Sequence, residues 1–340
     1  MEIEMALNRI RISRSLLILI IILVLFAGCL TIQPSSQNST AIQNPNESLN
    51  SGSTTHVVAI SAGFEHILAL KNDGTVDAWC YKGGKIVCDV PSNLSDVSAV
   101  AAGAQYSLAL KRDGTIVFWG FPDADNQLPT LMNLSKTVNI SAISTKVSHA
   151  LVLKSDGTVI ARGSSRLGAL DVPDNLTNVI QVSAGGDHSL ALKNDGTVVA
   201  WGPKSPCNIG PIQCDIYYRG QADVPANLTN VIQVSAGLEH SLALKSDGTV
   251  VAWGDDEYGQ TNVPANLTNV IAISAGYNHN LALKSDGTVV AWGDNEYGQT
   301  NVPANLTNVK SIAGGAGFSV ALKNDGTLVE WGLYIPIGKI

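Results

Sequence analysis

Histidine occupies one position of a recurring motif in five of seven copies, at His66, His149, His188, His240 and His279. If the copies surround an axis, these imidazoles form a ring, and imidazole nitrogens are common metal ligands. The other two copies have Tyr106 and Phe318 at this position, and neither side chain replaces a metal-binding imidazole. The pattern therefore favours buried histidines that hydrogen-bond to backbone within or beside their own repeat. It predicts no metal and no other cofactor.

Four of the five cysteines form two pairs that are close in sequence. Cys80 is near Cys88 and Cys207 is near Cys214, each pair within one irregular loop of the repeat. In an oxidising compartment such pairs usually form disulfides, whereas a zinc site needs about four ligands close together. No histidine is close in sequence to either pair. We therefore expect the disulfides Cys80–Cys88 and Cys207–Cys214.

Acidic turns are the other groups with chemical potential. Residues 255–258 read Asp-Asp-Glu-Tyr and residues 294–297 read Asp-Asn-Glu-Tyr. Carboxylates bind calcium, but the alternating ligand spacing of a calcium loop is missing. Glycoside hydrolysis requires a carboxylate pair about 5 to 10 Å apart, and here the acidic residues fall mainly in repeated turns. No Ser-His-Asp or Cys-His order stands out. We predict solvated acidic loops and no enzymatic activity.

Asparagine sequons recur along the chain. Those in an Asn-Leu-Ser/Thr segment of the repeat are Asn93, Asn133, Asn175, Asn227, Asn266 and Asn305, and further sequons begin at Asn38, Asn46 and Asn139. Each is a possible glycosylation site in an exported protein. Asparagine is also a natural turn residue after proline, so chain reversal alone explains the repeated segment.

All of these residues sit on one repeat that fills the chain from Val57 onward. Its Asp-Gly-Thr core recurs at intervals of 40, 43, 39, 52, 39 and 39 residues. Each copy contains three short apolar runs, and a Gln-Thr-x-Val-Pro segment is expected to supply a fourth strand. Asp-Gly between two apolar runs indicates a hairpin turn. A period near 39 with several strands per copy predicts an all-β fold, a seven-bladed β-propeller.

The motif Gly-x-x-His-Ser-Leu-Ala-Leu-Lys-x-Asp-Gly-Thr-Val-Val-Ala-Trp-Gly resembles the regulator of chromosome condensation repeat over residues 57–340. The resemblance implies a seven-bladed propeller. The Gln-Thr-x-Val-Pro continuation is similar to the bacterial branch of the family, which includes a secreted beta-lactamase inhibitory protein. Copy three departs from the pattern, with Thr145-Lys146 in place of Ala-Gly and Arg162 in place of tryptophan. The sequence does not indicate how the ring closes.

The N-terminal region predicts export and tethering. In residues 1–29, arginines precede an apolar run that ends in Ala27-Gly28-Cys29, which resembles a lipoprotein signal peptide with Cys29 as the lipidated residue. A plain secretory signal or an uncleaved signal anchor remains the alternative. Residues 30–56 are rich in Ser, Thr and Asn and are expected to form a flexible stalk. The propeller, residues 57–340, would then lie outside the cytoplasm, at the outer face of the cell membrane.

Two kinds of variable position are candidates for a binding surface. One is the dipeptide before the histidine, which includes Phe64, Glu65, Leu238, Glu239, Tyr277 and Asn278; the other is the outer loop, which includes Tyr217, Tyr218, Arg219, Tyr258 and Tyr297. A repeat copied for its architecture varies most where the architecture does not constrain it. Tyrosine and arginine are frequent anchors of protein interfaces.

The predicted function is therefore binding. The net charge of -7 and the pI near 5.3 argue against nucleic acid as a partner. We expect a monomeric, lipid-anchored surface module that binds an extracellular protein or glycan through its blade loops. The alternatives are a structural envelope or adhesion glycoprotein and, less favoured, a polysaccharide-acting enzyme on a propeller.

Overall fold

The structure is a computed structural model that describes residues 55–81, 85–134, 138–165, 167–203, 218–335 and 337. The expected signal peptide, the lipidation site and all but the end of the stalk lie outside the described residues, as do the positions Cys29, Asn38, Asn46, Cys207, Cys214 and Tyr217. None of the helices in the described ranges has the length and hydrophobicity that crossing a bilayer requires.

Seven three-stranded antiparallel sheets make up the described fold, each built from one sequence repeat. The first strands are β1 (Val57–Ala62), β4 (Val97–Ala102), β7 (Ile140–Thr145), β10 (Val179–Ala184), β13 (Val231–Ala236), β16 (Val270–Ala275) and β19 (Val309–Gly314). The second strands are β2 (His66–Lys71), β5 (Tyr106–Lys111), β8 (His149–Lys154), β11 (Ser189–Lys193), β14 (His240–Lys245), β17 (His279–Lys284) and β20 (Phe318–Lys323). The third strands are β3 (Val76–Cys80), β6 (Ile116–Gly120), β9 (Val159–Gly163), β12 (Val198–Trp201), β15 (Val250–Gly254), β18 (Val289–Gly293) and β21 (Leu328–Gly332).

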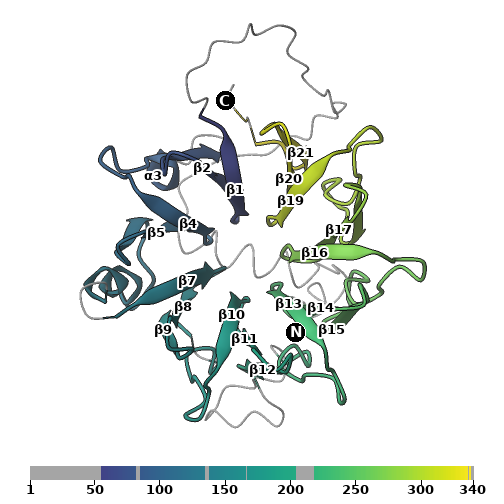
Figure 1. Cartoon of the computed structure of the whole chain (residues 1–340), viewed down its shortest axis with the longest axis horizontal. Coiled ribbons are helices and arrows are strands. Elements are labelled where there is room, and N and C mark those ends of the chain that lie inside the picture. Colours follow the sequence, from purple (N-terminus) through teal and green to yellow (C-terminus); the bar gives the residue numbers. More distant parts are fainter. Residues whose placement is uncertain are drawn as a thin grey trace, which may run out of the picture. The chain divides into compact units, whose positions relative to one another are not determined.

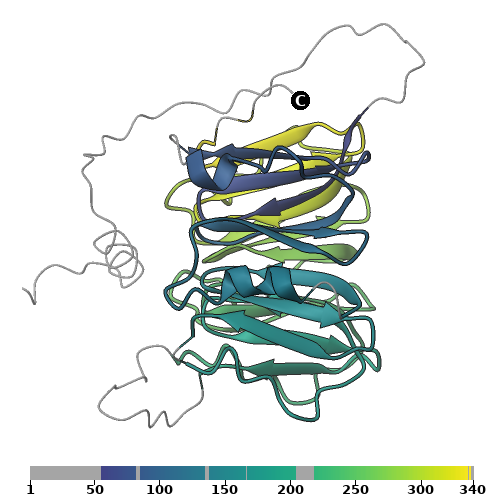
Figure 2. The ribbon, with the colours of Figure 1, turned by 90° about the vertical axis from the view of Figure 1, so that its left-hand side faces the viewer.

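The sheets are the blades of a propeller, which confirms the predicted fold class. Figure 1 shows the first strands around the central axis, and the blades follow one another in chain order. Figure 2 shows the strands from the side, running between two ends that carry the loops. Two short helices follow third strands, α3 (Lys85–Cys88) in blade 1 and the 3-10 helix η3 (Leu128–Asn133) in blade 2.

The expected fourth strand is absent from the described blades. In blade 5, residues 260–264 form local turns, with Asn262 N donating to Gly259 O and Val263 N donating to Thr261 O. These backbone groups are therefore not available for a fourth ladder. The segment instead offers the Gln260 carbonyl to the next blade, where the Trp292 indole N–H donates to it at 3.1 Å.

The Asp-Gly-Thr motif forms the predicted hairpin turn. In blade 4, Asp195 Oδ1 accepts hydrogen bonds from the backbone N–H of Thr197 at 3.0 Å and from its hydroxyl at 2.6 Å. Gly196 has a φ of +79°, which glycine adopts without the strain that a Cβ would add. The motif thus joins the second and third strands and has a structural role.

The hydrophobic core lies between blades. One cluster combines Leu190 and Leu192 of blade 4 with Val231, Val234 and Trp253 of blade 5, all less than a tenth exposed. Because each blade buries both faces against its neighbours, its strands carry apolar side chains on both sides. This packing holds the loops at the two ends in fixed relative positions.

Copy three lacks the tryptophan of the repeat, and nearby residues compensate for it. Arg162 is at the tryptophan position, and its guanidinium donates to the Ala161 carbonyl at 2.8 Å. The preceding outer loop forms η3, whose Leu128 and Leu131 are fully buried with Leu108 and Val152. The helix therefore supplies apolar surface at the blade boundary where the repeat lacks its indole.

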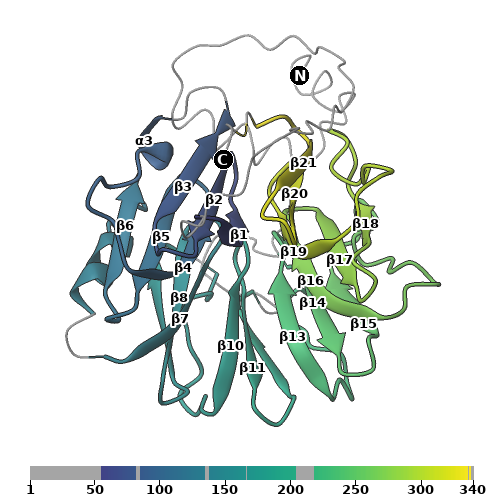
Figure 3. The ribbon, with the colours of Figure 1, turned by 45° about the horizontal axis from the view of Figure 1, so that its top comes forward.

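The ring closes by packing of blade 7 against blade 1. Phe318 and Val320 of β20 share a buried cluster with Ile67 of β2, and Leu322 shares another with Val57. Lys310 Nζ also donates to the Val57 carbonyl at 3.3 Å. Figure 3 shows β1 and β19 converging near the axis. Each blade remains made of one repeat, so no strand is exchanged to close the described ring.

Candidate functional site

We call the end of the propeller that carries the loops between first and second strands the loop face. Its loops comprise residues 63–65, 103–105, 146–148, 185–188, 237–239, 276–278 and 315–317. The register pairs His240 with Gly254, so the loop after each third strand begins at the same end. The variable dipeptides and the outer loops therefore gather on one face, on supports fixed by the blade core.

The five histidines lie beneath this face and connect neighbouring blades. Each is fully buried, and its Nε2 lies 2.7 to 3.0 Å from a side-chain oxygen of the next blade, in the pairs His66–Ser107, His149–Ser189, His188–Ser241, His240–Asn280 and His279–Ser319. The prediction that these histidines hydrogen-bond to backbone groups was wrong. The reason is that the next blade has a polar residue directly after its histidine, or after Tyr106 or Phe318 at the same position, and this side chain lies against the imidazole.

The hydrogen bonds also determine the histidine tautomer. Asn280 donates its amide to the Gln260 carbonyl at 2.8 Å, so its Oδ1 is the atom that meets His240, and this oxygen only accepts. His240 Nε2 therefore carries a proton, and Nδ1 has no hydrogen-bond partner. Burial lowers the pKa of His240 to about 4. The His240 imidazole is therefore neutral near pH 7, and it does not offer two free nitrogens to a metal ion.

A charged cluster lies on blade 5 and the outer loop before it. The Arg219 guanidinium is 3.7 Å from a Glu239 carboxylate oxygen and 3.5 Å from one of Asp255. Burial, followed by the neighbouring Asp255 carboxylate, raises the pKa of Glu239 to about 7, although Arg219 opposes the shift. Burial also raises the pKa of Asp187. One cation thus stands among several partly buried carboxylates on the loop face.

The centre of the face is filled by three side chains from different blades. Lys146 of blade 3 donates from Nζ to the Ala275 carbonyl of blade 6 at 2.6 Å, and Nζ is 5.7 Å from the centroid of the Tyr277 ring. The rings of Phe64 and Tyr277 have centroids 5.4 Å apart. Tyr277 is only 7% exposed, so it supports this face from within and does not project from it.

The other candidate residues are spread over the rim. Tyr297 is 44% exposed, and its ring covers Gly317, where an added Cβ would lie 2.9 Å from the tyrosine Cδ2. Tyr218 donates its hydroxyl to Asp223. The remaining candidates are Glu65, which is exposed, and Leu238, Asn278 and Tyr258, which are partly buried. The structure thus brings Arg219 and Glu239 together, and Phe64 and Tyr277.

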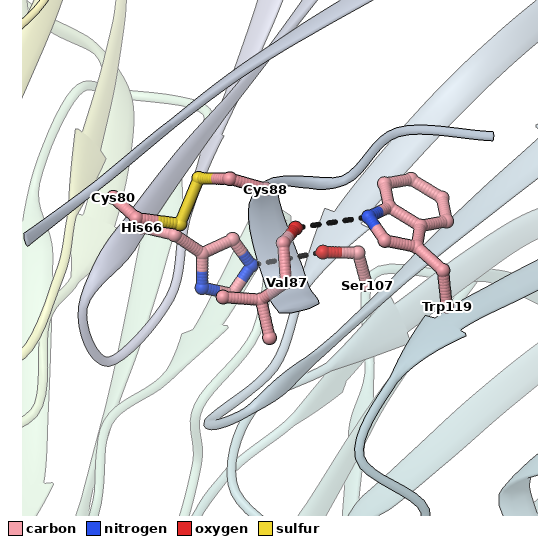
Figure 4. Close-up of a disulfide and its surroundings, with 6 residues drawn as sticks. All are labelled: His66, Cys80, Val87, Cys88, Ser107 and Trp119. Carbon is pink, nitrogen blue, oxygen red and sulfur yellow. Dashed lines mark hydrogen bonds between the residues drawn. A yellow bond between two sulfur atoms is a disulfide. The ribbon is translucent and has the colours of Figure 1, made fainter. Parts of the chain in front are cut away.

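The predicted Cys80–Cys88 disulfide is confirmed. It joins the end of β3 to α3, with the two Cα atoms 6.1 Å apart. Figure 4 shows the neighbouring Val87 carbonyl, which accepts a hydrogen bond from the Trp119 indole at 2.9 Å. The disulfide therefore fixes the loop that supplies this bond to blade 2.

The carboxylate oxygens of the acidic turns accept local hydrogen bonds. Asp255 Oδ2 accepts from the Gln260 amide at 2.7 Å, and Asp256 Oδ1 accepts from the Thr261 backbone N–H at 2.9 Å. Asp294 Oδ1 accepts from the Glu296 backbone N–H at 3.0 Å. Across the described ranges, no three His, Cys, Asp or Glu side chains are grouped so as to hold a metal ion.

The described sequon asparagines are all exposed, namely Asn93, Asn133, Asn139, Asn175, Asn227, Asn266 and Asn305. In five of the six copies of the repeated segment the leucine after the asparagine donates its backbone N–H to the preceding proline carbonyl, for example Leu228 N to Pro225 O at 3.2 Å. The segment is therefore a turn, as expected.

Sequence reasoning missed two parts of this site. Asp255 joins the charged cluster because the register of blade 5 places it beside Glu239, and Asp187 approaches from the neighbouring blade 4. Lys146 was visible as a departure from Ala-Gly, but the sequence did not show that its side chain crosses the axis to a residue 129 positions away. The signal for Lys146 was the loss of a glycine at one copy of an otherwise regular position.

The fold and the repeated blade boundaries define a repeat propeller of the seven-bladed class. The family profile described as "Regulator of chromosome condensation (RCC1) repeat" matches residues 57–79, 179–205, 231–260 and 270–299. Four segments of the chain therefore match the RCC1 repeat, and the described residues fold as an RCC1-like β-propeller. Comparison with curated proteins found no match.

Solved structures with the same fold come from several sources. The ectodomain of the receptor kinase CR4 from Physcomitrella patens has a TM-score of 0.65 at 15% identity, with 82% of this chain and 74% of that chain covered. The ectodomain of the Arabidopsis thaliana receptor kinase ACR4 has a TM-score of 0.62 at 17% identity, covering 84% and 100%. Prp20p from Saccharomyces cerevisiae has a TM-score of 0.61 at 18% identity, covering 79% and 84%. At these identities the similarity shows the fold alone.

Proposed function

We propose that the protein is a binding module that presents its loop face to a protein or glycan outside the cytoplasm. The observation that carries the proposal is the charged cluster of Arg219, Glu239 and Asp255, partly buried on the loop face at positions where the repeat varies. Charges held near low-dielectric surroundings interact strongly with a complementary partner. The rigid blade core supports such a surface without requiring any catalytic group.

A protein partner fits this surface best. Arginine and tyrosine are enriched among residues that dominate binding energy, and here Arg219 lies on the same face as the exposed Tyr297. Two of the structural relatives are receptor-kinase ectodomains, and the solved Prp20p structure is described with its binding to Gsp1p and histones. These properties belong to those proteins and support binding through the same architecture only by analogy.

The test is partner capture by the full-length protein from envelope and culture-medium extracts, followed by crosslinking to locate the contact. Arg219→Ala combined with Tyr297→Ala is expected to reduce capture at least tenfold. Ile232→Ser is the matched control, because Ile232 is 54% exposed near the start of β13, at the opposite end from the loop face. A partner that is captured equally by both variants would reject the loop face.

The outer loop between β12 and β13 needs a separate variant. Deletion of residues 204–217, which lie between described residues 203 and 218, is expected to reduce capture without a large fall in melting temperature. Unchanged capture would confine the binding surface to Arg219 and the residues that follow it.

Tethering is tested independently of binding. We propose that Cys29 carries the lipid and that the chain is exported, because Ala27-Gly28-Cys29 closes an apolar run with basic residues before it. Mass spectrometry of the mature protein is expected to find an N-terminal acylated cysteine. Cys29→Ala should then release the protein from the membrane fraction, and a protein retained without cleavage would show a signal anchor instead.

The narrower version of the binding function is inhibition of an extracellular enzyme. It rests on the similarity of the Gln-Thr-x-Val-Pro segment to the bacterial branch of the family. Identification of a hydrolase as the captured partner, with activity lost in the complex, would support it.

A second candidate is a structural envelope glycoprotein. It is favoured by the exposure of all seven described sequon asparagines. Glycan mass at these sites together with no saturable partner would support this role over specific binding.

A further inference from the structure

An axial cavity of about 330 Å³ lies at the centre of the propeller. Its walls are the first strands of blades 1 and 3 to 7, from Ile60–Ala62 round to Ile312–Gly314. This volume falls in the range of sites that hold small molecules. The cavity is separate from the charged cluster, because none of Arg219, Glu239 and Asp255 lines it.

Among the described residues, Lys146 is the only charged one that lines this cavity. Its side chain is buried, with 8% of the residue exposed. Nζ makes one hydrogen bond, to the Ala275 carbonyl at 2.6 Å, and the ion pairs found among the described residues do not include it. An ammonium group has three donors, so within the described ranges two of them have no acceptor and the positive charge has no counter-ion.

Serine hydroxyls add further donors to the wall. In five blades the serine near the end of the first strand accepts a backbone N–H from the next blade at 2.9 to 3.0 Å, at Ser61, Ser144, Ser183, Ser235 and Ser274. These bonds use an oxygen lone pair and leave the hydroxyl hydrogen of each serine to donate. All five serines line the cavity, whose wall is therefore rich in donors and has one cation.

The position of Lys146 makes this cation unusual. The other six repeats have glycine there, and in blade 5 a Cβ added to Gly237 would lie 2.1 Å from His240 Cε1. Blade 3 accommodates a side chain at this position and still keeps the His149–Ser189 bond. A buried charge without a partner is unfavourable in a folded protein. Architecture alone does not account for a lysine here.

We propose that the axial cavity is a binding site for a small carboxylate, with the Lys146 ammonium as its charged donor. The carboxylate oxygens would accept from Lys146 Nζ and from serine hydroxyls such as those of Ser235 and Ser274. In the part of the chain that the structure describes, no acidic residue lines the cavity to compete with such a ligand. The site is independent of the proposed partner surface.

Protonation of Lys146 is linked to this binding. Burial lowers the pKa of Lys146 to about 7. The titratable groups that interact with it electrostatically are His188, His240 and His279, which burial keeps neutral, and the Tyr277 ring lies beside it. A carboxylate would favour the ammonium form, so its affinity is expected to fall as the pH rises above about 7.

Isothermal titration of the full-length protein at pH 6 tests the proposal. Acetate and succinate are the free probes, and a short peptide ending in glutamate presents the same group on a partner chain. Acetamide and chloride at matched ionic strength are the controls. Saturable binding of either carboxylate source, absent for acetamide and chloride, is expected; response to the peptide alone would assign the carboxylate to a macromolecular partner.

Two variants locate the site. Lys146→Met keeps the bulk and removes the charge, and it is expected to weaken carboxylate binding at least tenfold. Lys154→Met is the matched control in the same blade, because Lys154 pairs with Asp156 near the opposite end, and its binding should stay within twofold of the unchanged protein. Equal binding by all three proteins, or no saturable binding of any carboxylate, would overturn the proposal.

Stability separates a ligand site from a structural brace. Without ligand, Lys146→Met is expected to melt at the same or a higher temperature than the unchanged protein, because a buried unpaired charge is removed. Lys146→Gly, which restores the residue of the other repeats, gives a second measure. Melting several degrees lower in both variants, with no carboxylate binding in the unchanged protein, would show that Lys146 only braces blades 3 and 6.

Discussion

Phe318 and Ile67 belong to one fully buried cluster where the last blade meets the first. At five other blade boundaries the corresponding pair is a histidine and a serine or asparagine joined by a hydrogen bond, as in His279 and Ser319 at 2.9 Å. Both members of the closing pair are therefore apolar together. This matched change distinguishes the junction of the chain ends from those five boundaries. At the sixth, between blades 2 and 3, Tyr106 donates its hydroxyl to the His149 carbonyl instead.

The closing pair is expected to behave as a coupled unit. Phe318→His alone would bury an imidazole against isoleucine without a partner, and we expect a loss of about 2 to 4 kcal/mol in the free energy of unfolding. Ile67→Ser alone should cost a similar amount through lost burial. The double variant recreates the polar pair, so its loss should be smaller than the sum by about 1 to 2 kcal/mol. Urea unfolding of the four proteins measures this coupling, and additive losses would contradict it.

The η3 leucines are expected to stabilise the packing between blades 2 and 3. Leu131→Ala should lower the free energy of unfolding by about 2 to 4 kcal/mol, because Leu131 is fully buried. Met132→Ala is the control, since Met132 is 43% exposed on the same helix, and its effect should stay near 0.5 kcal/mol. Comparable losses in both variants would mean that η3 does not replace the missing indole.

Much of the fold was predictable because the repeat states it seven times. The Asp-Gly-Thr turns and the three strands follow from local residue chemistry, as Asp195 and Gly196 illustrate. The prediction of a fourth strand was wrong because the turn around Gly259 and Asn262 forms its backbone hydrogen bonds locally. A pattern of apolar and polar residues does not show where those backbone bonds go.

The site was less predictable because its contacts join residues far apart in the chain. Sequence variation drew attention to Arg219 and Glu239, but their approach depends on how one blade's outer loop packs on the next blade. The histidine partners were missed for the same reason, since His188 meets Ser241 53 residues later. The contact of Lys146 with Ala275 could not be predicted from the sequence, because the side chain crosses the propeller axis to reach it.

The Cys80–Cys88 disulfide is expected to stabilise blade 1 and its contact with blade 2. Replacing both cysteines by serine should lower the free energy of unfolding by about 2 kcal/mol, the value for a short closed loop. Hydrogen exchange at the Trp119 indole should increase as well, because its acceptor Val87 lies beside Cys88. Thermal unfolding with and without reductant checks the first effect. An indole that exchanges no faster in the variant would separate the disulfide from the contact between blades.

The buried histidines predict a loss of stability in mild acid. Burial lowers the pKa of His66, His149 and His240 to about 4, and that of His188 and His279 to about 3. In the unfolded chain these side chains titrate near 6.5. Below that pH the unfolded state binds protons that the folded state excludes, so stability present at pH 7 falls as the pH drops from 6.5 toward 4.

The size of this effect follows from proton linkage. Each histidine contributes a loss on the order of 1 kcal/mol per pH unit within that window. Glu239 and Glu330 act in the opposite direction, because burial raises the pKa of each to about 7, and protonation of these carboxyls near pH 6 favours the folded state. Burial also raises the pKa of Asp187 and Glu65, but five histidines outweigh four carboxyls, so the net change remains destabilising. Urea unfolding between pH 4.5 and 7.5 measures the slope, and His279→Phe, which copies the residue at 318, should reduce it by about one proton. A slope unchanged in that variant would mean that His279 is not buried in its neutral form.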